Sequence, residues 1–287
     1  MRAKHLSSAY DLAIEECEND LRRQEEALER FSEHEEVVLW FEHDLFCQIH
    51  LVYLLNWFAQ RERGPTKLSL ICIGAFPGIK EFRGLGELSG EQMMSLFGKR
   101  HEVTVAELDL GSTSWAAYSS PDPRDLVTLL ASDTSALPFL GAALQKHLAR
   151  FPSLRNGLGQ IENRALNLIA GGAAQFGPLF EAFGKAEPIY GLGDAQFMLL
   201  LRQLAKGQLP LLTIVNGDGA TLASHSDFSK TSFTLTRHGD SVLRGEDDYV
   251  AQNGIEAWLG GVNLAGPDPQ WRWDEERSQL VSQNRLR

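Results

Sequence analysis

The chain has 287 residues, of which 43% are hydrophobic and 23% are charged, so it can form one large or two ordinary globular domains. Its net charge of −11 disfavours non-specific binding to nucleic acids and to anionic membranes. None of its three cysteines forms a C-x-x-C pair, which argues against a disulfide framework and a structural zinc site. Because we find no signal peptide and no long apolar segment, we expect a cytoplasmic protein without a membrane span.

The first half of the chain begins with a helical pattern and continues with a strand–helix–strand unit. Apolar residues recur at helical spacing over 8–31, which predicts one long amphipathic helix. The run "VVLWF" at 37–41 predicts a buried strand, residues 44–59 predict a well-covered helix, and "LSLICI" at 68–73 predicts a second buried strand. A right-handed crossover would make the two strands parallel.

Helices are predicted for the remainder of this half. Ser89 with Gln92, and Thr104 with Glu107, have the spacing of capping boxes that open helices. Two further helices are predicted at 123–131 and 135–150. We therefore predict an α/β N-terminal domain over residues 1–151, with a short parallel sheet and abundant helices.

The second half, residues 152–287, is predicted to be a mainly α domain that resembles a winged helix. It opens with the turn-rich stretch "PSLRNGLG" at 152–159. Three helices followed by a two-stranded hairpin is the element order of a winged helix. Trp258, Trp271 and Trp273 are expected to pack the C-terminal tail back onto the first domain, and residues 216–219 are expected to form a hairpin turn. The three helices are predicted at 161–171, 176–184 and 193–205, and the two strands at 211–215 and 232–235.

Glu42, His43 and Asp44 are the candidate catalytic residues, because they follow the first strand directly. In an open α/β sheet, ligands bind at the carboxyl ends of the strands. A histidine between two carboxylates can act as a general base, with one carboxylate fixing its tautomer. No metal site is predicted, because two further ligands would be needed and spacing identifies none. A purely structural role, with Asp44 capping the following helix, is the competing interpretation.

The glycine-rich loop at 74–89 follows the second strand and should reach the same edge of the sheet. We expect it to bring Glu81 and Arg83 near the trio, with Arg83 holding an anionic ligand. Gly84 and Gly86 are included as ligand-binding candidates, although "GLGEL" lacks the third glycine of a dinucleotide fingerprint.

Cys47 and His147 are two further residues with chemically active side chains. Cys47 lies one helical turn from His43, so a thiolate–imidazole pair is geometrically possible, but an inert buried thiol is the favoured interpretation. His147, on an apolar helix, is interpreted as a buried structural histidine.

Several motifs in this chain resemble the bacterial family called domain of unknown function 1835. The resemblance covers most of the length and implies no established activity. Members usually have Asp at the position of Cys47, so a ligand or base could be altered here, and they tend to begin earlier with an additional strand and turn. The motifs are "VVLWFEHDLF" at 37–46, "GLGEL" at 84–88 with Gln92, "LPFLGAALQKHL" at 137–148, "FPS" at 151–153 with Asn156 and Gly157, "GIEAWLGGVNL" at 254–264 and "WRWD" at 271–274.

Three functions remain open at this point. The first is a non-catalytic regulatory module that binds a small molecule or a protein partner at the end of the first strand. The second is an enzyme of hydrolase or phosphotransfer type that acts on a phosphorylated or nucleotide-like small molecule through Glu42, His43 and Asp44. The third is a DNA-binding regulator, which the acidic composition makes the weakest. The sequence identifies no cofactor and no oligomeric state.

Overall fold

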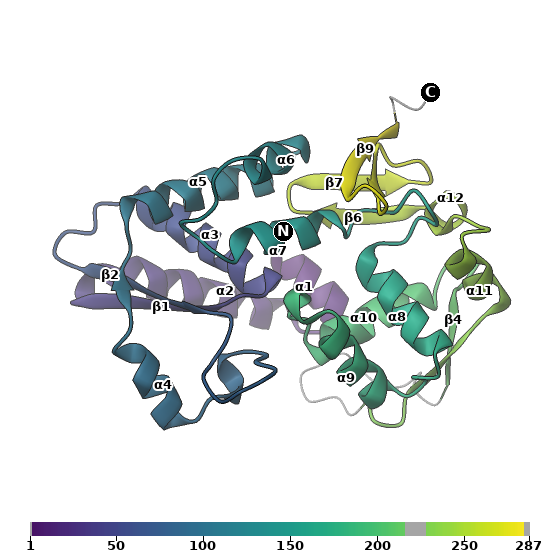
Figure 1. Cartoon of the computed structure of the whole chain (residues 1–287), viewed down its shortest axis with the longest axis horizontal. Coiled ribbons are helices and arrows are strands. Elements are labelled where there is room, and N and C mark those ends of the chain that lie inside the picture. The colour runs from purple at the N-terminus through teal and green to yellow at the C-terminus, as the bar shows by residue number, and fades with distance from the viewer. Residues whose placement is uncertain (1, 216–227, 284–287) are drawn as a thin grey trace.

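The computed structural model describes residues 2–215 and 228–283, and about half of the chain is helical. Figure 1 shows a small sheet with its helices on one side of the molecule and a second group of helices on the other, with the C-terminal strands lying above them. No helix in the described residues is long and apolar enough to cross a membrane.

The sheet contains the predicted strand–helix–strand unit. Strand β1 (Glu36–Glu42) leads into α3 (Leu45–Ala59), and β2 (Lys67–Ile73) returns parallel to β1, with Glu42 opposite Ile73. The third strand, β3 (His101–Glu102), pairs antiparallel with β2. The sheet is therefore mixed rather than parallel throughout, and the prediction missed β3 because two residues are too short to show an alternating pattern.

The N-terminal helical pattern forms two helices instead of one. Helix α1 (Arg2–Tyr10) ends before Asp11, whose positive φ of 57° is incompatible with a continuing right-handed helix, and α2 (Ile14–Glu29) follows. Within α2 only Cys17 is buried, because most of this helix faces solvent.

The rest of the first half is helical, as predicted, and both capping boxes are present. Ser89 caps α4 together with Gln92, and Thr104 caps α5 together with Glu107. The elements are η1 (Arg30–Glu33), η2 (Leu85–Glu87), α4 (Gly90–Phe97), α5 (Val105–Ser119), α6 (Arg124–Leu130) and α7 (Leu140–Leu148). Helix α7 begins five residues later than the predicted start at 135.

The second half has three helices, then an antiparallel pair of strands, then two short helices. The predicted turn at 216–219, between the two strands, lies outside the described residues. The elements are α8 (Gln160–Ala170), α9 (Phe176–Ala186), η3 (Pro188–Tyr190), α10 (Asp194–Leu204), β4 (Leu212–Val215), β5 (Ser232–Leu235), α11 (Arg237–Arg244) and α12 (Tyr249–Asn253).

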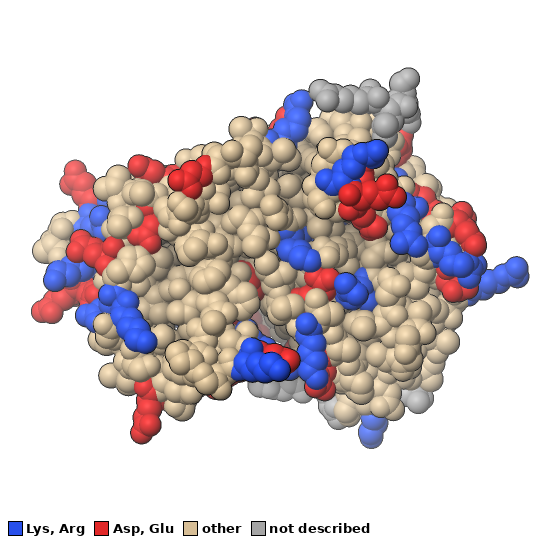
Figure 2. All heavy atoms as spheres, viewed as in Figure 1, with Lys and Arg blue, Asp and Glu red and all other residues tan. Residues whose placement is uncertain are grey.

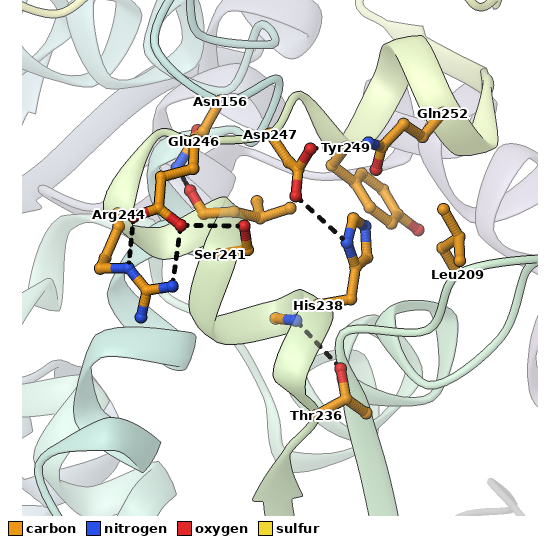
Figure 3. Close-up of polar contacts among 12 residues, drawn as sticks. Asn156, Leu209, Thr236, His238, Ser241, Arg244, Glu246, Asp247, Tyr249 and Gln252 are labelled. Atoms are coloured by element: carbon orange, nitrogen blue, oxygen red, sulfur yellow. Dashed lines mark hydrogen bonds and ion pairs between the residues drawn. The ribbon is translucent and has the colours of Figure 1, made fainter.

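Polar contacts connect the segment around α11 to the turn that precedes α8 (Figure 3). Thr236 caps α11 by accepting a hydrogen bond from the N–H of Gly239 at 2.9 Å. The side-chain amide of Asn156 donates to the carbonyl oxygen of Val242 at 3.1 Å, and the backbone carbonyl oxygen of Asn156 accepts from the N–H of Tyr249 at 2.8 Å. These bonds fix α11 and α12 against the start of the second half.

Two hairpins that the sequence pattern did not predict end the described chain. They are β6 (Ile255–Leu259) with β7 (Val262–Gly266), and β8 (Trp271–Asp274) with β9 (Gln279–Ser282). Trp271 and Trp273 are buried against the first half, as expected. The expectation for Trp258 is wrong: its side chain is 65% exposed, because it lies on the outward face of β6.

Two hydrophobic cores hold these elements together. The first joins β1, β2, α3, α5, α6 and α7 to the C-terminal hairpins. The second joins α8, α9, α10, α11 and the β4–β5 pair, and it also receives Leu45 and Ala143 from the first half. Helices α3 and α7 therefore contribute side chains to both cores, which places α3 at the junction of the two halves.

Candidate functional site

Glu42 and Asp44 meet Cys47 at the edge of the sheet where β1 ends and α3 begins. One ligand atom from each of the three residues lies within 4.8 Å of the others. The Oε1 atom of Glu42 accepts a hydrogen bond from the backbone N–H of Leu85 at 2.7 Å. The carboxylate of Glu42, at the end of β1, is therefore in direct contact with the loop that follows β2. This agrees with the parallel pairing, which brings the carboxyl ends of both strands to the same edge of the sheet.

Burial changes the acidity of Glu42. Desolvation raises the pKa of its carboxyl group above the ordinary value, and the nearby charge of Asp44 acts in the same direction. The hydrogen bond from Leu85 and the imidazole of His43 oppose this rise. A carboxyl group with a raised pKa can hold or release a proton closer to neutral pH than an exposed glutamate can.

Asp44 has the structural role that the competing interpretation gave it. Its Oδ1 atom accepts a hydrogen bond from the N–H of Cys47 at 2.9 Å, so the side chain caps α3. The residue is 5% exposed and packs against Gly191, which follows η3 in the second half. Asp44 therefore holds the start of α3 and a loop of the second half together.

His43 lies beside two aromatic side chains. Its ring is 6.5 Å from that of Phe82 and 6.2 Å from that of Phe139, measured between centroids. The Nδ1 atom is buried and has no hydrogen-bond partner in the described part of the chain. The carboxylate–imidazole hydrogen bond that would fix a tautomer is absent among those residues. The neighbours of the His43 ring are instead the aromatic rings of Phe82 and Phe139.

The glycine-rich loop supplies Gly84 to this site but not the charged side chains proposed with it. Gly84 is buried against Glu42 so closely that a Cβ atom there would overlap the carboxylate. Arg83 is exposed and turns to Glu87, with 4.0 Å between its Nε and a carboxylate oxygen. Glu81 and Gly86 are exposed as well. In the described part of the chain, Arg83 makes no hydrogen bond or ion pair with Glu42, His43 or Asp44.

Cys47 is not an activated nucleophile in this setting. Burial, together with the negative charge of Asp44, raises the pKa of its thiol to about 12. At neutral pH the thiol is protonated, which contradicts a thiolate–imidazole pair with His43. The sulfur, Glu42 and Asp44 together could ligate a divalent cation, but the thiol would have to lose its proton on binding.

A cavity of about 510 Å³ opens beside this site, between the two halves of the chain. Its walls include Leu45 and Phe46, which follow Asp44 directly, and Tyr190 and Leu192, which flank Gly191. The residues that adjoin Asp44 on one side of this contact and Gly191 on the other therefore line the cavity. The other lining residues are Arg2, Ile49, His50, Tyr53, Trp115, Tyr118, Arg150, Ile161 and Gln196.

Sequence reasoning missed this cavity, although it identified the strand end next to it. Trp115 and Tyr118 have the three-residue spacing of an ordinary apolar helix face. Tyr190 and Arg150 come from elements that are distant in the sequence. Only the packing of η3 against α3 and α7, and of α10 against α1, brings the two halves together here, and no local pattern carries that information.

Comparisons with protein-family models, with curated proteins and with solved structures find no match to this chain.

Proposed function

We propose that this protein is a non-catalytic ligand-binding module, in which a small molecule occupies the cavity beside the end of β1. The position of the cavity supports this most directly. Its lining comes from α1, α3 and α5 of the first half and from α8, η3 and α10 of the second. Its volume of about 510 Å³ lies within the range of roughly 300–1,000 Å³ usual for small-molecule sites.

A ligand in this place would contact both halves of the protein at once. The Asp44–Gly191 contact forms part of the same junction. Binding would therefore stabilise one arrangement of the two halves over others, which is how a regulatory module transmits occupancy. In this proposal the second half, with the element order of a winged helix, receives that signal and docks a protein partner in the cytoplasm.

Charge supports a protein partner over DNA for the second half. On the face drawn in Figure 2, basic and acidic side chains are intermixed and form no continuous basic surface. Several arginines of the second half are also paired with carboxylates, as Arg244 is with Glu246 at 2.8 Å (Figure 3). A DNA-binding surface needs cations that are free to contact phosphates.

The proposal is tested by melting-temperature measurements with a library of small metabolites. At about 100 times its dissociation constant a ligand adds roughly 2.7 kcal/mol to the free energy of unfolding, a clear shift. Leu192→Trp should fill the cavity and abolish the shift. Leu209→Trp, which adds the same bulk at an exposed residue away from the cavity, should preserve it.

Two results would contradict the proposal. If every stabilising compound stabilises folded Leu192→Trp as much as the wild type, the cavity is not the binding site. If the protein turns over a substrate and His43→Ala abolishes that turnover, the protein is an enzyme.

The enzyme alternative is favoured by one observation, the cluster of Glu42, Asp44 and Cys47. We propose as a second candidate that a divalent cation bound there assists hydrolysis or phosphoryl transfer on a nucleotide-like substrate. The resemblance to the domain of unknown function 1835, whose members usually have Asp at position 47, supports a test with Cys47→Asp. Stronger Mn²⁺ binding by this variant than by the wild type, measured by calorimetry, is the expected result. Equal absence of binding in both would refute the candidate.

A further inference from the structure

The cavity between the two halves has aromatic walls. Tyr53 on α3 lies 5.0 Å from Trp115 on α5, and Trp115 lies 5.9 Å from Tyr118, measured between ring centroids. Phe46, on the same side of the cavity, is 52% exposed although it is a large apolar side chain. Aromatic surface of this kind favours contact with a planar, unsaturated ligand, which would remove it from water.

The charged side chains described at the cavity are basic. Arg2 and Arg150 line it, and no Asp or Glu occurs among the lining residues in the described part of the chain. This is unusual in a chain whose net charge is −11. A cavity with two cations and no carboxylate attracts an anionic ligand and repels a cationic one.

Arg150 has no ion-pair partner in the described chain, whereas most buried or half-buried arginines are paired. Arg150 acts electrostatically on the carboxyl group of Glu162. Burial raises the pKa of this carboxyl group and favours its neutral form. Arg150 lines the cavity together with Tyr118 and Tyr190, so it lies next to the aromatic wall. It is therefore placed to accept an anion that carries its own aromatic ring.

We propose that the cavity binds a planar aromatic compound that carries an anionic group, with its ring against Tyr53, Trp115 and Tyr118 and its anionic group on Arg150. This inference rests on the proposed ligand-binding function and names the class of ligand. A carboxylate or a phosphate would satisfy Arg150 equally, since guanidinium binds both through paired hydrogen bonds.

The experiment uses one ring with different substituents. The probes are 1-naphthoate, 1-naphthyl phosphate, neutral 1-naphthylmethanol and cationic 1-naphthylmethylamine, with cyclohexanecarboxylate as an anion without an aromatic ring. Binding to the full chain is measured by calorimetry and by the melting temperature. We expect 1-naphthoate, 1-naphthyl phosphate or both to bind, and to bind more tightly than the other three probes. The preferred one of the two identifies the anionic group.

Arg150→Gln and Arg237→Gln form a matched pair of variants. Both lose one positive charge, but Arg237 is exposed on α11 and does not line the cavity. Arg150→Gln should raise the dissociation constant of the anionic probes about 10- to 100-fold, the usual effect of losing a hydrogen bond to a charged group. Arg237→Gln should leave it unchanged, and the melting temperatures of both variants without ligand show that they fold.

The outcomes separate this inference from the function on which it rests. If the neutral or cationic probe binds as tightly as the anions, or if Arg150→Gln binds the anions as the wild type does, the ligand class is wrong and the cavity function stands. If no probe binds, the ligand class is also wrong. The cavity function is then decided independently by the metabolite library and the Leu192→Trp variant.

Discussion

Asp44 and Gly191 touch at the junction of the two halves, and each depends on the other's geometry. Asp44 caps α3, and Gly191 has a φ of 57°, in the left-handed region that glycine adopts without strain. A Cβ atom on residue 191 would overlap the Asp44 carboxylate. The same pair therefore lies where α3 begins and adjoins Leu45 and Leu192, which line the cavity.

Gly191→Ala should destabilise the protein by roughly 2–4 kcal/mol, because it adds backbone strain and displaces a helix cap. The matched control is Gly64→Ala. Gly64 has a similar φ of 55°, but its added Cβ would meet nothing within 4 Å. The control should show only the smaller cost of the strain. If chemical denaturation shows that both variants lose the same free energy of unfolding, the contact with Asp44 contributes nothing to stability.

Glu42→Gln should make the protein more stable at pH 7 than the wild type. The raised pKa of Glu42 means that the folded state favours the protonated carboxyl group. The contribution of this carboxyl group to the free energy of unfolding is therefore fully present below pH 4.5, the ordinary pKa, and is lost as the pH rises through the raised pKa. The advantage of the variant should disappear below about pH 4. Denaturation curves at several pH values measure this difference in the free energy of unfolding between the variant and the wild type.

Glu36→Gln serves as the comparison of opposite sign. Hydrogen bonds from Arg100 lower the pKa of Glu36 to about 2, so the charged form stabilises the folded state above pH 4.5 and the benefit is lost as the pH falls through about 2. This variant should be less stable than the wild type at pH 7. If both variants shift stability in the same direction at neutral pH, the electrostatic account of Glu42 is incorrect.

Cys47 should react slowly with thiol reagents in the native protein. A thiol with a pKa of about 12 has very little thiolate at pH 7.4. The variant Cys17→Ala/Cys72→Ala leaves Cys47 as the one thiol, and its reaction with a disulfide reagent can be followed by absorbance. Rapid reaction of the folded variant at pH 7.4 would show that the thiol is activated after all. Denaturant should restore the full rate.

His147 should make the protein sensitive to acid below pH 6.5. The side chain is 1% exposed, and burial lowers its pKa from 6.5 to about 3. Between these values the unfolded chain binds a proton that the folded chain does not, so stability falls by up to about 1.4 kcal/mol per pH unit. His147→Phe should reduce this dependence of stability on pH, whereas His5→Gln, at an exposed position, should leave the dependence unchanged. An unchanged slope in His147→Phe would assign the acid sensitivity to other groups.

The strand–helix–strand unit and the position of the strand end could be predicted because local signals agree there. The apolar run before Glu42 and the capping side chain of Asp44 each define a boundary, and the structure places β1 and α3 accordingly. The buried character of His147 was also predicted correctly, because an apolar helix face surrounds it.

The C-terminal hairpins and the cavity could not be predicted, for a different physical reason. The pairing of β8 with β9 involves four residues in each strand, too few for a clear alternation, and Trp271 to Asp274 are buried on both faces. The relation of Arg150 to Tyr118 and Tyr190 depends on how helices of the two halves pack. The outward position of Arg83 depends on its neighbour Glu87, which sequence spacing alone does not favour over Glu42.

The hairpins at the end of the described chain complete a core that begins more than two hundred residues earlier. Trp273 exchanges backbone hydrogen bonds with Pro152 and Leu154, both at 2.8 Å, and its ring packs in the first core. A protein cut at residue 151 would lose this cover and leave a large apolar surface in contact with water. The first core is therefore completed only after residues 271–282 have been synthesised, and a nascent chain that ends before them would expose apolar surface that favours aggregation.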